Sequence, residues 1–311
     1  MSSALAVASF LLMLLTGLGM GSDANGASPA PGVGIAAKYP GDSGIERDPA
    51  VLLYEGFEQP LRQVEWRQPG GWFDLALGPG KGAEITDTLP AGGKQCLQFS
   101  LKQGKQGSGG MFHLIAPSEI IYLRYYRRFA EDWQWPVGYG PHDAMLFGGT
   151  FQAPTDTDLS IYADFWMTGD TVLRIATARQ RLGYEGWHQY LRDRCPRAKA
   201  QDPPGGNQFP WNRSVPDKIV PGRWHCVEAM VKLSTPGKDD GEVRLWVNGK
   251  LVSEYTDVPL RDAQHPDLKL NMVFLAPYFH PGSPRDQTHW ADAIVVATSY
   301  IGPIAAGAAK R

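Results

Sequence analysis

The chain has 311 residues, of which 43% are hydrophobic and 20% are charged, and its formal net charge is −2. This charge excludes a generally basic nucleic-acid-binding protein, so that any affinity for polyanions must come from local groups of cations. The 36 glycines and 25 prolines, together with the lack of a long segment of 3.6-residue periodicity, favour many short strands over a helical bundle.

The N-terminus begins with an apolar run, residues 4–20, which is followed by small residues. The run is short for a membrane span and is interrupted by threonine and glycine, so we expect residues 1–27 to be a cleaved secretory signal. An uncleaved anchor is the alternative. We therefore predict a secreted or periplasmic protein without stable membrane insertion after cleavage. Residues 28–45 are rich in Gly, Pro and Ala and are predicted to be a flexible linker.

Short alternating runs recur from residue 46 to residue 303 and are typical of β-strands. Turn residues separate them, and Asn248-Gly249 is a strong hairpin signal. This pattern predicts one antiparallel β-sandwich domain, residues 46–303, followed by a tail of residues 304–311. The predicted strands lie at residues 50–58, 94–102, 110–116, 119–129, 159–167, 171–178, 224–234, 241–255, 268–279 and 291–301.

The run at residues 119–129, EIIYLRYYRRF, carries three tyrosines and three arginines. Because successive side chains of a strand point to opposite faces, one face receives a polar and aromatic row: Tyr122, Arg124, Tyr126 and Arg128. Several guanidinium groups would need partners if they were buried. The row is therefore predicted to be either solvated surface or the floor of a groove for an acidic ligand.

Residues 179–222 break the strand rhythm and are predicted to form a long loop. Loops of this length in compact domains are usually functional or disordered. Six Lys and Arg residues lie between positions 179 and 199 against two acids, Glu185 and Asp193, which is a local excess of four cations. The loop is a second candidate for contact with an anion.

Three cysteines are too few and too scattered for a disulfide framework or a zinc site. Cys96 and Cys226 lie in predicted strands, where a buried thiol is expected. A single disulfide in an exported protein is the alternative, with Cys195 as the odd residue.

Several segments, in their order along the chain, resemble the concanavalin A-like jelly rolls. They are FE at 57–58, YLRYYRRF at 122–129, a Gly-Gly turn after HDAMLF, GRWHCVEAMVKL at 222–233, GEVRLWVNGKLV, LNMVF and DAIVVATSYIGP. Within this fold the chain is most similar to the secreted polysaccharide lyases related to heparinase I and to alginate and glucuronan lyases. The resemblance rests on strand patterns and covers about residues 50–303.

The resemblance implies an acidic, uronate-containing polysaccharide as the partner, held in the groove of a concave sheet. It implies that Arg124, Tyr126 and Arg128 face this groove, and that His142 and Asn271 match family positions for proton transfer and carboxylate neutralisation.

The chemistry of β-elimination gives roles to these side chains. A proton beside the uronate carboxylate becomes acidic only when a cation neutralises the carboxylate, which suits Arg124. Tyr126 lies between two arginines that would favour its phenolate, and His142 is the second candidate base or acid. The further substrate-binding candidates are Arg128, Asn271, Arg181, His188, Tyr190 and Tyr278.

Two other functions remain open. A carbohydrate-binding or lectin-like module of the same fold would bind the sugar without cleaving it. A glycoside hydrolase is the other alternative, although the E-x-D-x-x-E carboxylate spacing of the glucanases of this fold does not occur in the sequence.

The resemblance also implies a structural Ca²⁺ where the first and last strands meet, with Glu58 and Asp292 as carboxylate ligands. A solvated pair of carboxylates is the alternative. No motif for an organic cofactor or for nucleic-acid binding occurs in the sequence.

Overall fold

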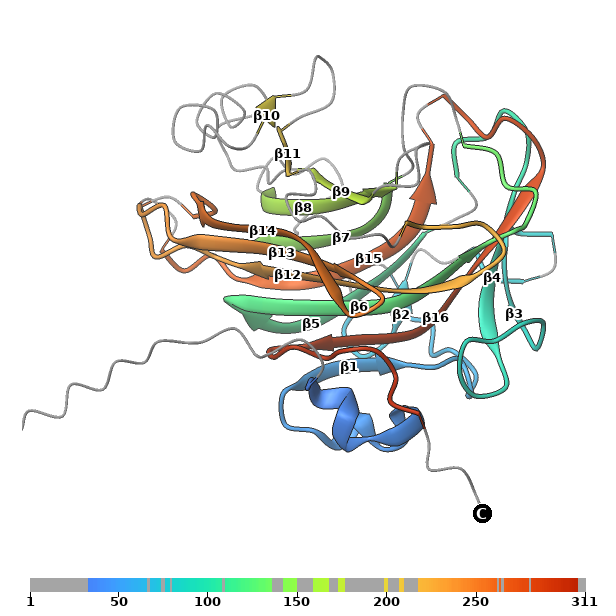
Figure 1. Ribbon diagram of the computed structural model, residues 1–311, viewed down its shortest axis with the longest axis horizontal. Coiled ribbons are helices and arrows are strands. Elements are labelled where there is room, and N and C mark those ends of the chain that lie inside the picture. The colour runs from blue at the N-terminus through green and yellow to red at the C-terminus, as the bar shows by residue number, and fades with distance from the viewer. Residues whose placement is uncertain are drawn as a thin grey trace, which may run out of the picture.

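The protein, described here from a computed structural model, consists of two antiparallel β-sheets that pack face to face (Figure 1). No helix in the described part of the chain is long and apolar enough to span a membrane. The structure describes residues 33–65, 68–73, 76–78, 80–107, 110–135, 142–149, 159–167, 173–176, 199–200, 207–209, 218–261, 263, 266–279 and 281–306.

The first sheet has the strand order β14-β13-β12-β6-β16-β4-β3, and β1 pairs with β16 outside this order. Asn248 and Gly249 join β13 to β14 with φ values of 52° and 75°, as the predicted hairpin requires. The strands are β1 (Val51–Glu55), β3 (Ala83–Thr86), β4 (Cys96–Leu101), β6 (Ile120–Phe129), β12 (Trp224–Lys232), β13 (Gly241–Val247), β14 (Lys250–Val258) and β16 (Gln287–Ala297).

The second sheet has the order β10-β11-β9-β8-β7-β15-β5-β2. The all-β antiparallel sandwich predicted from the sequence is confirmed. The sequence pattern missed β2, β3, β10 and β11, because strands of two to four residues carry too little alternation to be recognised. It also missed β7, because its apolar run lacks alternation and ends in the two glycines that were interpreted as a turn. The strands of this sheet are β2 (Trp72–Phe73), β5 (Met111–Ser118), β7 (His142–Gly149), β8 (Leu159–Met167), β9 (Leu173–Ala176), β10 (Lys199–Ala200), β11 (Asn207–Phe209) and β15 (Leu270–Tyr278).

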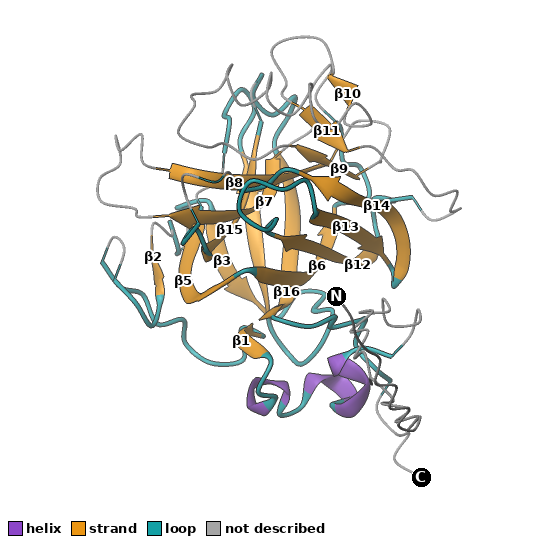
Figure 2. Cartoon of the chain, turned by 90° about the vertical axis from the view of Figure 1, so that its left-hand side faces the viewer, coloured by secondary structure: helices purple, strands orange, loops and turns teal. Residues whose placement is uncertain are grey.

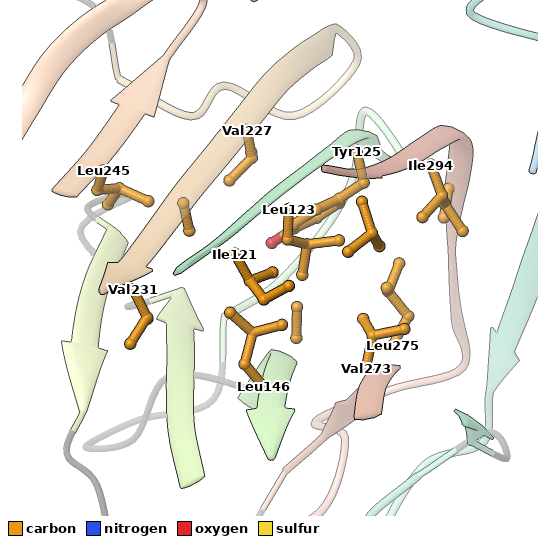
Figure 3. Packing of buried hydrophobic residues seen from close by; sticks show 14 of the residues in the cluster. Ile121, Leu123, Tyr125, Leu146, Val227, Val231, Leu245, Val273, Leu275 and Ile294 are labelled. Carbon is orange, nitrogen blue, oxygen red and sulfur yellow. The ribbon is translucent and has the colours of Figure 1, made fainter. Parts of the chain in front are cut away.

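The main core lies between the two sheets and follows the alternation of their strands. Along β6, Ile121, Leu123 and Tyr125 are fully buried and point into the space between the sheets, as Figure 3 shows. From the second sheet, Leu146 and Val273 meet them there. The opposite row of β6 therefore lies on the outer face of the first sheet.

An N-terminal segment, residues 33–48, covers part of that outer face. It contains three short 3-10 helices, η1 (Ile35–Lys38), η2 (Pro40–Asp42) and η3 (Ile45–Arg47), which Figures 1 and 2 show beside β1. Ile35 and Ile45 are buried with Tyr122 in a second apolar cluster. The prediction of a flexible linker over residues 28–45 is thus wrong for the described residues from 33 onward, because a few apolar side chains suffice to dock the segment.

The C-terminal residues complete this layer. The backbone amides of Ile35 and Ala36 donate to the carbonyls of Tyr300 and Ile301 over 3.0 and 2.9 Å. The two ends of the described chain are therefore hydrogen-bonded to each other on the outer face of the first sheet.

Two of the three cysteines lie in described strands, and both are free and buried. Burial raises the pKa of the Cys96 and Cys226 thiols to about 12, so both are unreactive, as expected. Cys195 lies outside the described residues.

Candidate active site

Arg124 lies in the middle of β6 and is completely buried on the outer face of the first sheet. Its guanidinium forms a bidentate ion pair with Asp42 of the N-terminal segment. It also donates to the backbone carbonyls of Ala293, at 3.0 Å, and Gly302, at 3.3 Å. Arg124 therefore connects three segments of the protein, and the expectation that it faces a substrate groove is wrong.

Tyr126 is the neighbouring residue on the same face, and its hydroxyl accepts a hydrogen bond from the backbone amide of Ile304 at 2.9 Å. Burial raises the pKa of Tyr126 above its ordinary value, and this outweighs the opposing effect of Arg124. The phenolate expected from the neighbouring arginines is thus disfavoured, and the C-terminal residues lie over the hydroxyl. Arg128 ends the row, half-buried, where its backbone pairs with Trp224 and Trp290.

The second sheet brings two other predicted residues together. His142 at the start of β7 is the direct cross-strand partner of Tyr278 at the end of β15. Facing residues of an antiparallel pair have Cβ atoms about 4.5–5.5 Å apart. Tyr278 is 36% exposed, and its hydroxyl donates to Oε1 of Gln106 at 2.8 Å. The backbone register therefore sets position 142, a histidine, directly opposite the accessible phenol of Tyr278.

The backbone pairing extends this row across four strands. His142 also pairs with Trp166 of β8, and Trp166 pairs with Arg174 of β9. Sequence reasoning had not selected Trp166 or Arg174, because cross-strand register depends on the sheet order and cannot be read from local alternation. We call Tyr278, His142, Trp166 and Arg174 the cross-strand row.

A loop of residues 102–107 is fixed beside Tyr278. The amide of Phe279 donates to the Gln106 carbonyl at 2.6 Å, and the amide of Ser283 donates to the Lys105 carbonyl at 2.9 Å. An ion pair of 2.8 Å between Lys102 and Asp286 adds a further link. The loop is thus held against the exposed phenol.

Asn271 lies at the opposite end of β15, half-buried. Seven residues of extended chain separate it from Tyr278, which corresponds to roughly 20 Å. Asn271 therefore cannot act at the same reacting centre as the Tyr278–His142 pair.

The inner side of the same end of the sandwich holds buried polar groups. Asp143, the residue after His142, accepts a hydrogen bond from the Tyr125 hydroxyl and forms an ion pair with Arg127, both at 2.6 Å. Arg127 also contacts Nδ1 of His289 at 3.2 Å. Burial, and then the charge of Arg127, lowers the pKa of His289 well below its ordinary value, so its imidazole is neutral.

The two predicted calcium ligands lie against one loop, residues 91–95. Oδ2 of Asp292 accepts from the amides of Ala91 and Gly92 at 2.8 and 3.0 Å. Oε1 of Glu58 accepts from the two amides at residues 94–95, at 2.6 and 2.9 Å. Burial, more than the nearby Glu58 charge, raises the pKa of Asp292 to about 7.

These contacts bear on the expected calcium ion. The described residues contain no group of three or more His, Cys, Asp or Glu side chains that could hold a metal. Ca²⁺ takes six to eight oxygen ligands, whereas here backbone amides occupy oxygens of both carboxylates. The arrangement does not fit a preformed calcium site, so the expected ion would bind Glu58 and Asp292 only after displacing these amides.

The remaining predicted binding residues, Arg181, His188 and Tyr190, lie outside the described residues, as does most of the cationic loop at residues 179–222. Their part in a site stays a prediction.

Comparison with known proteins identifies the fold. No protein-family model matches the chain. The structure is similar to the marine PL-14 alginate lyase from Aplysia kurodai, with a TM-score of 0.51 and 15% identity, covering 70% of this chain and 87% of that one. The alginate lyase vAL-1 of Chlorella virus gives a TM-score of 0.51 at 15% identity, covering 69% and 88%. The resemblance to jelly-roll polysaccharide lyases is thus confirmed for the fold.

Proposed function

We propose that this protein is a polysaccharide lyase that cleaves a uronate-containing polymer by β-elimination, with the cross-strand row as its catalytic centre. The observation that carries the proposal is the direct pairing of His142 with the exposed Tyr278. It occurs in a jelly roll similar to those of two alginate lyases. The acidic polymer as substrate is inferred from these two proteins and from the groups that the row combines.

The reaction assigns a role to each of these groups. A base takes the proton from C5 of the uronate, the C5 electron pair forms the C4=C5 double bond, and the C4–O bond breaks. The leaving oxygen then takes up a proton. We assign the imidazole of His142 as the base and the hydroxyl of Tyr278 as the acid, because a phenol can donate to the departing oxygen.

The carboxylate must be neutralised while the C5 proton leaves, because charge develops on it in the transition state. We assign this role to Arg174, the residue of the cross-strand row with a permanent positive charge and a planar fork of donors that matches a carboxylate. Arg124, which the sequence suggested for this role, is already paired with Asp42.

The layers of the fold support this location of the site. The N-terminal segment and the C-terminal residues occupy the outer face of the first sheet around Arg124 and Tyr126. We therefore place the polymer on the outer face of the second sheet. Export, which residues 4–20 predict, would bring the enzyme to an extracellular polymer.

The test is incubation of the mature protein with alginate, glucuronan, pectic and heparin-type polymers while the ultraviolet absorbance of the unsaturated uronate is followed. We expect one polymer to give a rising signal. His142→Ala should lower kcat by about 10²- to 10⁴-fold, the usual contribution of a proton-transfer group, and Tyr278→Phe should act similarly.

Tyr126→Phe is the matched control, since it removes a phenol on the opposite side of the molecule and should leave kcat unchanged. Absorbance traces that stay flat with all four polymers would overturn the lyase proposal. Equal loss of activity in Tyr126→Phe and Tyr278→Phe would overturn the placement of the site.

A carbohydrate-binding module is the second candidate, favoured by aromatic rings on the outer face of the second sheet. Phe112 stacks on Phe73 with ring centroids 5.5 Å apart and contacts Phe274 at 4.2 Å. Phe112 and Phe274 are only partly buried. Such rings can pack on the apolar faces of sugars, so binding without a new chromophore would identify this function.

A further inference from the structure

Arg127 and Asp143 form an ion pair in the core between the two sheets. Both side chains are at most 1% exposed, and Nη2 of Arg127 lies 2.6 Å from Oδ1 of Asp143. The Tyr125 hydroxyl donates to the other carboxylate oxygen at 2.6 Å, and Nη1 of Arg127 lies 3.2 Å from Nδ1 of His289. We call these four residues the inter-sheet cluster.

Filling a core with charged and polar groups is energetically unfavourable compared with filling it with apolar side chains. A buried ion pair contributes little net stability, because desolvation of the two charges offsets their attraction, and well-packed apolar residues often do as well or better. Nε of Arg127 and Nε2 of His289 have no hydrogen-bond partner among the described residues, which adds to the cost. Packing alone therefore does not explain the cluster.

Asp143 lies in an irregular part of the second sheet. Between His142 and Ala144, β7 advances two residues while β8 advances one, from Trp166 to Phe165. Asp143 is thus the extra residue of a β-bulge. On the other side, β15 has the extra residue, because it advances three positions from Leu275 to Tyr278 over the same two residues of β7.

Bulges redirect neighbouring side chains and are common next to active sites. In a regular strand Asp143 would share its face with Met145, whereas here its carboxylate reaches Tyr125 and Arg127 in the core. Both partners come from β6 of the first sheet. The bulge is therefore held by bonds that cross from one sheet to the other.

We propose that Asp143, held by Arg127 and Tyr125, is a positioning residue that locks the bulge of β7 and thereby sets His142 opposite Tyr278. The proposal rests on the proposed function. Without the ion pair, nothing polar holds the extra residue inward, and a shift of one residue in the pairing would exchange the faces of the strand.

The experiment replaces both partners together, since removal of one would leave a buried charge and unfold the protein. In the Arg127→Met/Asp143→Leu variant we expect the melting temperature to be equal or higher, kcat to fall by about 10- to 100-fold and KM to change less than about twofold. A displacement of about 1 Å at a catalytic group is enough for such a loss.

The matched control is Arg124→Met/Asp42→Leu, which replaces the other buried Arg–Asp pair of β6 on the opposite face of the same strand. This variant should keep kcat within about twofold of the wild type. The positioning role would be overturned if Arg127→Met/Asp143→Leu kept full kcat, or if both double variants lost kcat equally.

A separate readout distinguishes this proposal from the proposed function. The imidazole NMR resonances of His142 should move in Arg127→Met/Asp143→Leu and stay in place in Arg124→Met/Asp42→Leu. If the wild type cleaves no polymer but the resonances move as expected, the lyase assignment fails and the positioning of His142 holds. Unmoved resonances in both variants would overturn the positioning.

Discussion

Asp42 is required for the stability of the fold, because it neutralises the charge of the fully buried Arg124. Removal of one partner of such a pair leaves an uncompensated buried charge. We therefore expect Asp42→Ala to lower the free energy of unfolding by about 3–5 kcal/mol, as measured by urea denaturation. Asp286→Ala, which breaks the exposed pair with Lys102, is the control and should have little effect. Equal stabilities of the two variants would contradict the role assigned to Asp42.

Glu228 gives the protein a pH-dependent stability. Its carboxylate accepts hydrogen bonds from the amides of Ile301 and Gly302, both at 2.8 Å, and burial raises its pKa from 4.5 to about 7. Between these two values the folded protein binds more protons than the unfolded chain, so stability falls as the pH rises. The shift corresponds to about 3 kcal/mol, all of which is lost above pH 7.

Urea unfolding at pH 4.5 and pH 8 measures this effect. Wild type should lose more stability over the interval than Glu228→Gln, in which this group cannot ionise. Asp292, whose pKa burial also raises to about 7, should contribute a slope of the same sign in both proteins. Identical pH slopes in the two proteins would show that Glu228 does not titrate in this range.

At the scale of elements, alternation predicted the two faces of β6 correctly but not which face would meet solvent. Ile121, Leu123 and Tyr125 form the core, as a strand pattern allows. The opposite row was misjudged because Asp42, which makes burial of Arg124 possible, is 82 positions away in a segment with few apolar residues. Partners this remote leave no local signal, and the same holds for the His142–Tyr278 register.

The N-terminal segment should therefore behave as part of the fold. A chain that begins at residue 49 loses Asp42 and the apolar contacts of Ile35 and Ile45 with Tyr122. A chain that begins at residue 33 keeps all of them. We expect the first to melt several degrees lower than the second, since each 1 kcal/mol shifts the midpoint of a domain of this size by about 2–4 °C. Equal melting temperatures would show that the segment is dispensable.

At the scale of the whole molecule, the two outer faces of the sandwich differ in what they can do. Asp42 of the N-terminal segment lies 82 positions before Arg124 in the sequence, and Gly302 and Ile304 lie 178 positions after Arg124 and Tyr126. These two chain ends close the first sheet over Arg124 and Tyr126. The paired His142 and Tyr278 belong to the other sheet, whose strands lie between residues 72 and 278. The fold thus uses one outer face for closure, which is the reason that we place the proposed polymer on the other.

Calcium was expected where the first and last strands of the sandwich meet. At this point Asp292 of β16 and Glu58, which follows β1, hold the loop at residues 91–95. Their oxygens already accept backbone amides, so an added cation would have to displace those bonds. We expect neither EDTA nor millimolar Ca²⁺ to shift the melting temperature by more than about 1 °C. An ion present at 100 times its dissociation constant would add about 2.7 kcal/mol, which corresponds to about 5 °C or more. A shift of that size, absent in Asp292→Asn, would show that the two carboxylates leave the amides and bind calcium.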